Sequence, residues 1–293
     1  MPHEPLLHWP EPILAYLEFV AAFLAVGAIG FRYFIVRQAA PLGDTPNVQV
    51  YAAAAQRAAL LGMVGTLLGM MHLVTALPRM AERLNTTVIG AVTGSLVPGA
   101  WVAFTLVALL GFVIAAADKP IGWPLAAIGV VGAALREALA GHWARLINPV
   151  HLLAGGFWIG TLFVMLVAGL GVVLTHERAR DRRTMVVDMV NAFSPLALVS
   201  AGMLVLFGGI TAWRHLKRLD ALLTTPYGWA LIAKLSLVAV VFVLGAWNWR
   251  RQRPRLGTDE GAHSIRRSAT AELVAAGVVL AATAILVSLP APK

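Results

Sequence analysis

Two histidines stand where a polar stretch of the sequence enters a long apolar run. His142 and His151 bracket the segment "HWARLINPVH", and a third histidine, His72, directly follows Met70 and Met71 at the end of another apolar run. Imidazole suits copper and zinc, and the thioether of methionine selects Cu(I). The chain has no cysteine, so a thiolate site is excluded. These residue types predict a soft-metal site built from histidine and methionine.

The spacing after His151 suggests a path for such an ion. Trp158 and Met165 follow at intervals of seven residues, which is about two turns of a regular α-helix and places all three on one face. With Met203 on a later apolar run, they form a candidate pathway. The plain alternative is that each methionine only fills the packing between helices.

Two ionisable residues lie inside apolar runs, where charge is costly and marks a functional candidate. Glu18 and Lys234 lie at similar depths in the first and seventh runs. Their matching depth allows a buried ion pair. The alternative is that Lys234 extends its long side chain outward to the interface.

The elements that position these residues follow from composition. The chain is 59% hydrophobic and only 13% charged, with a mean hydropathy of +0.78. A membrane-spanning helix needs about 20 predominantly apolar residues. The sequence therefore predicts an all-α polytopic membrane protein with about eight transmembrane helices in a bundle. The qualifying runs are roughly 12–36, 51–77, 98–117, 121–139, 149–174, 192–213, 227–248 and 268–289.

The connections divide and orient this bundle. Four runs fall in 1–140 and four in 141–293, which suggests two four-helix halves. The net charge of +9 comes from basic residues gathered at helix ends, most of all in 174–191 and 249–267. We read this charge as topology rather than nucleic-acid binding, and it favours both termini outside. The segment 84–101 is expected to be an outer interfacial or re-entrant piece.

This topology collects imidazoles on one face of the membrane. The outer set comprises His3, His8, His72, His142, His151 and His215, whereas His176 and His263 fall inside. Small residues near these positions permit close helix packing; they are Gly62, Gly65, Gly69, Gly155, Gly156 and Gly160. Asn248 is expected to bond backbone at a helix end. The chain lacks a P-loop, a G-x-S-x-G motif and an H-E-x-x-H motif, so we expect no enzyme.

The later half resembles the copper-resistance protein D family. The resemblance covers about 142–290 and rests on "GHW", "HLLAGGFWIG", "FSPLALVSAGMLVLFGGITAW", "LLTTPYGWALIAK" and "IRRSATAELVAAGVVLAATAILVSLPAP". It implies a multi-pass protein of the bacterial inner membrane with an outward-facing copper site. It also implies import of periplasmic copper beside a separate periplasmic copper-binding partner.

The resemblance carries over to particular residues. His142 matches the loop histidine, and His151 with Trp158 matches the pair that opens the fifth span. The later motifs contribute Tyr227, Lys234 and Glu272. The chain departs from the family at Thr161, which stands where a second glycine is common, and it lacks the fused copper-carrier domain of some members.

Three functions remain open from the sequence. The first is copper import, with Cu(I) bound by His72, His142 and His151 together with Met70 and Met71. The second is a b-type haem protein that moves electrons, with His72 and His151 as axial ligands and small residues at Gly69, Gly155 and Gly156 beside the macrocycle. The third is an assembly or sensor protein that keeps the metal site but transports nothing.

Overall fold

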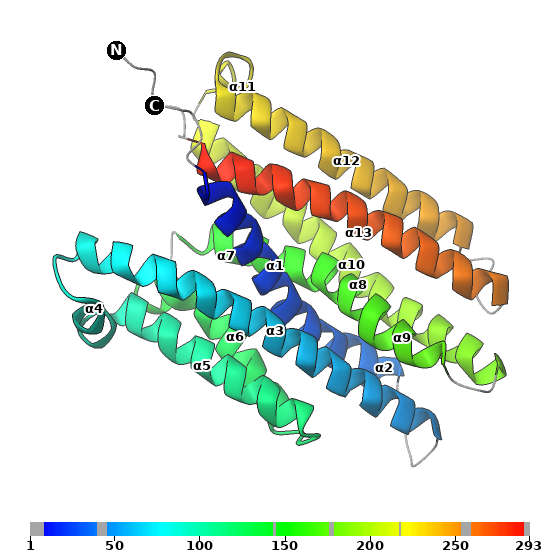
Figure 1. Cartoon of the computed structure of the whole chain (residues 1–293). Coiled ribbons are helices and arrows are strands. Elements are labelled where there is room, and N and C mark those ends of the chain that lie inside the picture. The colour runs from blue at the N-terminus through cyan, green and yellow to red at the C-terminus, as the bar shows by residue number, and fades with distance from the viewer. Residues whose placement is uncertain are drawn as a thin grey trace.

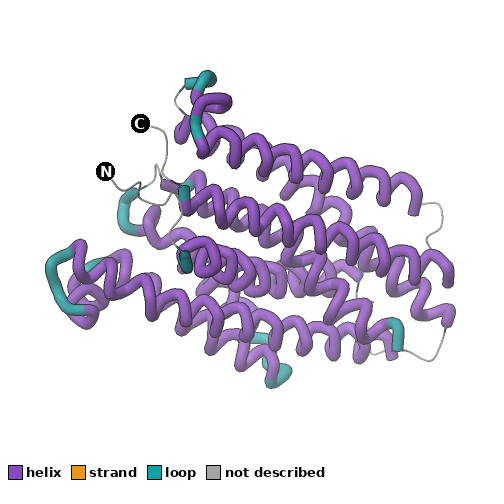
Figure 2. Tube along the Cα trace, turned by 45° about the horizontal axis from the view of Figure 1, so that its top comes forward, coloured by secondary structure: helices purple, strands orange, loops and turns teal. Residues whose placement is uncertain are grey.

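The computed structural model describes residues 9–39, 46–142, 145–175, 179–216, 218–252 and 259–289. Every regular element in these residues is a helix, as Figure 2 shows. Among them, eight helical stretches are long and apolar enough to cross a membrane. The predicted all-α bundle of eight spans is therefore confirmed. The stretches are Glu11–Ala39, Asn47–Arg83, Leu96–Ala116, Gly122–Leu139, Ile147–Val173, Arg182–Leu216, Pro226–Trp247 and Arg267–Ser288.

Some spans combine α-helix with wider π-helical turns. The elements are α1 (Glu11–Gly30), η1 (Phe31–Val36), α2 (Arg37–Ala39), α3 (Pro46–Arg83), α4 (Val88–Gly94), α5 (Leu96–Ala116), α6 (Gly122–Leu139), α7 (Ile147–Gly155), η3 (Gly156–Gly160), α8 (Thr161–Val164), η4 (Met165–Leu170), α9 (Gly171–Val173), α10 (Ala179–Leu216), α11 (Ala221–Thr224), α12 (Pro226–Gln252) and α13 (Asp259–Ser288). The fifth span thus contains two π segments, η3 and η4.

Helix α1 is the central element of the bundle. It packs against α3 on one side and against η3 and α8 on another, and it also contacts α13, so the first and last spans lie side by side (Figure 1). Helices α5 and α6 pair beyond α3, whereas α12 packs mainly on α13 at the opposite edge. We call the end of the bundle that holds Glu11, Arg83, Leu96, Leu139 and Ile147 the histidine end.

Backbone-to-backbone packing brings α1 against η3. A Cβ atom added at Gly160 would overlap the carbonyl oxygen of Phe23, and one added at Gly27 would overlap the backbone of Gly160. The two helices therefore approach as closely as glycine allows, which is how helices gain contact where lipid gives no hydrophobic drive. Gly69 differs from the other predicted packing glycines, because a Cβ there would meet nothing within 4 Å.

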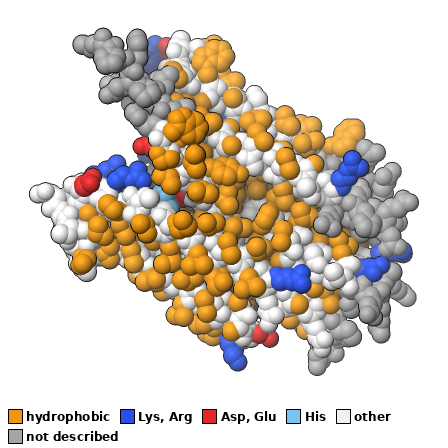
Figure 3. Space-filling view, viewed as in Figure 1, with side chains coloured by type: hydrophobic (Ala, Val, Ile, Leu, Met, Phe, Trp, Pro, Cys, Tyr) orange, Lys and Arg blue, Asp and Glu red, His pale blue; other side chains and the backbone are white. Residues whose placement is uncertain are grey.

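The outer surface is apolar. Hydrophobic side chains cover most of the face in Figure 3, with charged groups near its borders. The later spans leave the widest faces uncovered: Leu198 on α10 is 76% exposed and Val243 on α12 is 66% exposed. Such exposed faces are expected of helices that meet lipid.

The segment 84–101 forms a short helix and the start of a long one. Thr87 caps α4 by accepting a hydrogen bond from the backbone N–H of Gly90 at 3.1 Å, and α5 begins at Leu96. Helix α4 contacts α3 and α5 at the histidine end (Figure 1).

The α1–η3 contact predicts an effect of one methyl group. Gly160→Ala should lower the free energy of unfolding by about 1–3 kcal/mol, because the added carbon forces two backbones apart. The matched control is Gly202→Ala, since an added Cβ at Gly202 meets nothing within 4 Å. Thermal unfolding of both variants in detergent measures the difference. Equal midpoints for the two variants would contradict the close approach.

Candidate functional site

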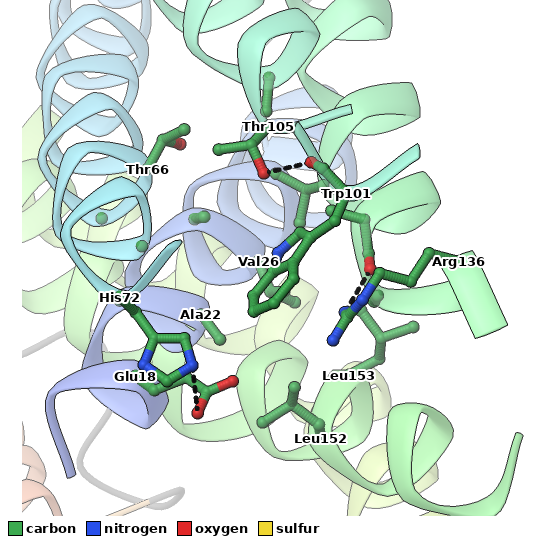
Figure 4. Close-up of a pocket in the computed structure, with 18 residues that line it drawn as sticks. Glu18, Ala22, Val26, Thr66, His72, Trp101, Thr105, Arg136, Leu152 and Leu153 are labelled. Carbon is green, nitrogen blue, oxygen red and sulfur yellow. Dashed lines mark hydrogen bonds and ion pairs between the residues drawn. The ribbon is translucent and has the colours of Figure 1, made fainter. Parts of the chain in front are cut away.

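A cavity of about 120 Å³ opens between helices at the histidine end. Figure 4 shows its polar side chains gathered over α1, α3, α5 and α6. Its room comes from small residues, because alanine and glycine leave space that larger side chains would fill. The small lining residues are Ala21, Ala22, Ala25, Gly65, Gly69, Ala108, Ala133 and Ala134.

His72 lies at this cavity, held by two neighbours. Its Nε2 is 3.4 Å from Oε2 of Glu18, and its ring centroid is 5.7 Å from that of Trp101. The other ring nitrogen, Nδ1, is buried and has no hydrogen-bond partner. A metal-ligating histidine commonly donates its second ring N–H to a carboxylate, which fixes the tautomer and orients the ring. The Glu18 carboxylate lies on one side of the His72 ring, at Nε2, and leaves Nδ1 as the other nitrogen.

Arg136 completes the polar wall on the other side of Trp101. Its guanidinium carbon is 4.0 Å from the centroid of the Trp101 ring, so Trp101 lies between His72 and Arg136 (Figure 4). One guanidinium nitrogen donates to the carbonyl of Ala133 at 2.8 Å, while Nε is buried without a partner. Sequence reasoning missed Arg136, although an arginine inside an apolar run was a signal that could have identified it.

His151 lies outside the cavity of His72 and packs against α10. A Cβ at Gly208 of α10 would lie 2.9 Å from its Cε1, so the imidazole packs where that glycine leaves room. Its Nδ1 is buried without a hydrogen-bond partner, and the ammonium of Lys234 on α12 is close enough to interact with it electrostatically. Its neighbours Leu152 and Leu153 line the cavity of His72, whereas His151 does not.

His142 lies in the exposed loop between α6 and α7. Its Nδ1 is 3.7 Å from Oε2 of Glu137, with half of its side chain exposed. Glu137 also accepts a hydrogen bond from Arg145 at 2.9 Å. The predicted ligands His72, His142 and His151 therefore have three different surroundings. No group of three His, Cys, Asp or Glu side chains that could hold a metal ion occurs among the described residues.

Of the remaining histidines, the structure describes the side chain of one and not those of the others. His215 is fully engaged in packing, because its Nδ1 is 2.8 Å from the carbonyl oxygen of Thr211 and its ring stacks on Tyr227. His3, His8 and His176 lie outside the described residues, as do the side chains of His263 and Asn248.

The predicted pathway residues do not form one row. Trp158 packs at a tilt against Phe242 of α12, with ring centroids 5.1 Å apart. Met165 is buried in the core, but Met203 is 37% exposed on α10. The seven-residue spacing assumed a regular α-helix, and the π turns of η3 and η4 change the angular register. Met71 is 67% exposed and faces away from its neighbour His72, as adjacent helical residues do.

Glu18 has a different partner from the one that matching depth suggested. Its carboxylate pairs with His72 on α3, because α1 packs beside α3. Lys234 belongs to α12, which packs on α11 and α13, and the ion pairs of the described residues include none between Glu18 and Lys234.

The geometry does not favour a haem between His72 and His151. A shared macrocycle needs two imidazoles that face one gap, yet His72 lies at the cavity and His151 packs on α10. Two of the three glycines expected beside the haem pack against α1, since a Cβ at Gly155 would lie 2.7 Å from the Phe23 ring and one at Gly156 would lie 2.7 Å from Val26, whereas the space at Gly69 is open.

This separation predicts a spectroscopic result. Purified protein mixed with haem should show no Soret band of a bis-histidine b-type centre, because the two imidazoles cannot reach one iron without repacking α1. Titration in detergent followed by absorbance measures this. A stoichiometric low-spin spectrum that disappears in both His72→Ala and His151→Ala would overturn the assignment.

Fold and site together define a polytopic helical membrane protein with a histidine held beside a cavity between its helices. Residues 187–286 match the family model described as Copper resistance protein D. This segment covers most of α10, all of α11 and α12, and nearly all of α13. The resemblance predicted from the sequence is confirmed there.

A relative extends the likeness beyond that segment. The chain is 29% identical over 178 residues to the copper transport protein CutJ of Bacillus subtilis (strain 168). The match covers 58% of this chain and 31% of that protein, so the chain spans about a third of the length of the curated relative it matches. No solved structure matches the chain.

Proposed function

We propose that this chain binds copper and carries it across the membrane, with His72 as the imidazole that takes up the ion. The observation that carries this proposal is the Glu18–His72 pair at the cavity, with Nδ1 of His72 left without a hydrogen-bond partner. The family match over 187–286 and the copper-transporting relative support copper as the cargo.

The chemistry of the pair suits a soft ion. When Nε2 carries the proton and donates it to the Glu18 carboxylate, the lone pair of Nδ1 is free to bind a metal. Imidazole is a good ligand for copper. The Glu18 charge, 3.4 Å from the ring, also offsets the positive charge of Arg136 on the far side of Trp101.

His151 is the second imidazole in the proposal. It packs on Gly208, and Gly208 lies within the segment 187–286 that matches the family model. The Nδ1 atom of His151 also has no hydrogen-bond partner. The nearby Lys234 ammonium repels a cation. We therefore assign uptake of the ion to His72, and we place His151 outside the cavity at which the ion enters.

The direction of transport in this proposal is inward. Basic residues in 174–191 and 249–267 favour a cytoplasmic position for the end opposite the histidine end. The histidine end would then face the periplasm of a bacterial inner membrane, with both termini on that side. Copper would reach it from a separate periplasmic copper-binding protein or as the free ion, with Cu(I) favoured by the soft ligands.

The proposal predicts which histidine binds copper. His72→Ala should abolish binding of the first Cu(I) equivalent, because it removes the ligand nitrogen. Competition with a chromophoric Cu(I) chelator under anaerobic conditions measures stoichiometry and affinity. The control is His142→Ala, whose imidazole is half exposed in the loop and whose loss should leave binding intact. Binding that depends on His142 but not on His72 would refute the assignment.

Replacing Glu18 is predicted to weaken copper binding without abolishing it. Glu18→Gln should keep the stoichiometry and weaken Cu(I) affinity by about 10–100-fold, the usual cost of losing a carboxylate that orients a ligating histidine. The same competition assay measures it. An unchanged affinity in a folded Glu18→Gln protein would show that the carboxylate does not support the ligand.

A further inference from the structure

A second cavity, of about 230 Å³, opens at the end of the bundle opposite the histidine end. It is lined by the first four spans, which also line the first cavity together with Leu152 and Leu153 of α7. The first span contributes Arg32 and Val36, α3 contributes Val48, Tyr51, Ala52, Ala55 and Gln56, and the region from α5 to α6 contributes Ala115, Asp118, Lys119, Pro120 and Trp123.

The two cavities follow one another along these helices. Helix α3 runs from Ala55 and Gln56 at the second cavity to Gly65 and Thr66 at the first. On α5, the nearest lining residues are Ala108 and Ala115. Seven residues of α-helix rise about 10 Å, so the partition between the cavities is thin compared with a hydrocarbon core of about 30 Å.

Two large side chains stand in this partition, and Phe112 is the larger. Phe112 is fully buried, and its ring fills the space that Gly62 leaves on α3, since a Cβ at Gly62 would overlap it. The same ring meets Trp123, which lines the second cavity, edge-on at 6.3 Å. The other is Ile29, which is 4% exposed and lies on α1 between Ala25 of the first cavity and Arg32 of the second. A shift of Phe112 therefore removes the larger of the two side chains from the partition.

The charged groups differ between the two cavities. The first cavity has Glu18 facing His72, with Arg136 on the other side of Trp101. The second is lined by one acidic residue, Asp118, and two basic residues, Arg32 and Lys119; Asp118 and Lys119 lie in the exposed connection between α5 and α6. A cation bound to the His72 imidazole therefore meets a carboxylate at the first cavity, where charged groups within the spans mark an ion or solute path.

We propose that the first, second, third and fourth spans form the transport route of this chain, with the two cavities as its ends and Phe112 as the barrier between them. This inference rests on the proposed transport function and assigns its path. The route lies in α1, α3, α5 and α6, outside the segment 187–286 that matches the family model.

The absence of cysteine from the chain makes the route testable. Single-cysteine variants would be exposed to a charged thiol reagent that cannot cross membranes, added to either face of sealed, oriented vesicles. Thr66→Cys at the first cavity should react only from one face, and Ala55→Cys at the second cavity only from the other. Ala59→Cys in the partition should react from neither.

Replacing the barrier should open the partition. Phe112→Ala should accelerate labelling of the Ala59→Cys variant about tenfold or more, which corresponds to about 1.4 kcal/mol in the barrier. The matched control is Leu110→Cys on the same helix, which is 55% exposed on the outer surface and should stay unlabelled because lipid covers it. Phe112→Leu serves as the milder replacement if Phe112→Ala does not fold.

The outcomes separate the route from the cargo. The route is overturned if Thr66→Cys and Ala55→Cys are labelled from the same face, or if neither is labelled. It is also overturned if Ala59→Cys stays unreactive in a folded Phe112 variant. Copper uptake that continues in that case leaves the proposed function standing. Labelling as expected with no copper binding at His72 supports the route and overturns the copper proposal.

Discussion

The close approach of α1 to η3 is the contact on which the rest of the bundle depends. Only glycine at Gly27 and Gly160 lets these backbones touch, and lipid supplies no hydrophobic drive that could replace such packing. Because α1 also packs on α3 and α13, this contact ties the two sequence halves together. The core of buried side chains accordingly includes residues from both 1–140 and 141–293, and the division at residue 140 stays a prediction.

The Glu18–His72 pair also depends on where α1 packs. A charged group at membrane depth persists when a partner stabilises it, and α1 provides one for Glu18 by setting it beside His72 at the cavity. The small residues around the pair leave room rather than bulk, so the carboxylate, the imidazole and the Trp101–Arg136 stack share one space (Figure 4).

Much of this fold was predictable, because membrane spans can be recognised in a sequence by their length and hydropathy. The contacts of the site were less predictable. Matching depth suggested Glu18 with Lys234, but depth says nothing about which helices are neighbours, and α12 packs away from α1. The spacing of His151, Trp158 and Met165 assumed regular α-helix, and π turns altered it. The residue types nevertheless directed attention to His72 and Glu18, whose pairing depends on contacts distant in sequence.

The neighbouring positions of α1 and α13 have a consequence for biogenesis. A translating ribosome delivers α1 to the bilayer long before α13, yet these helices contact each other in the folded bundle. Contacts between segments so distant in sequence form late and slowly. The nascent chain must therefore hold α1 in the bilayer with part of its surface still against lipid or the insertion machinery, and this contact forms only when α13 arrives.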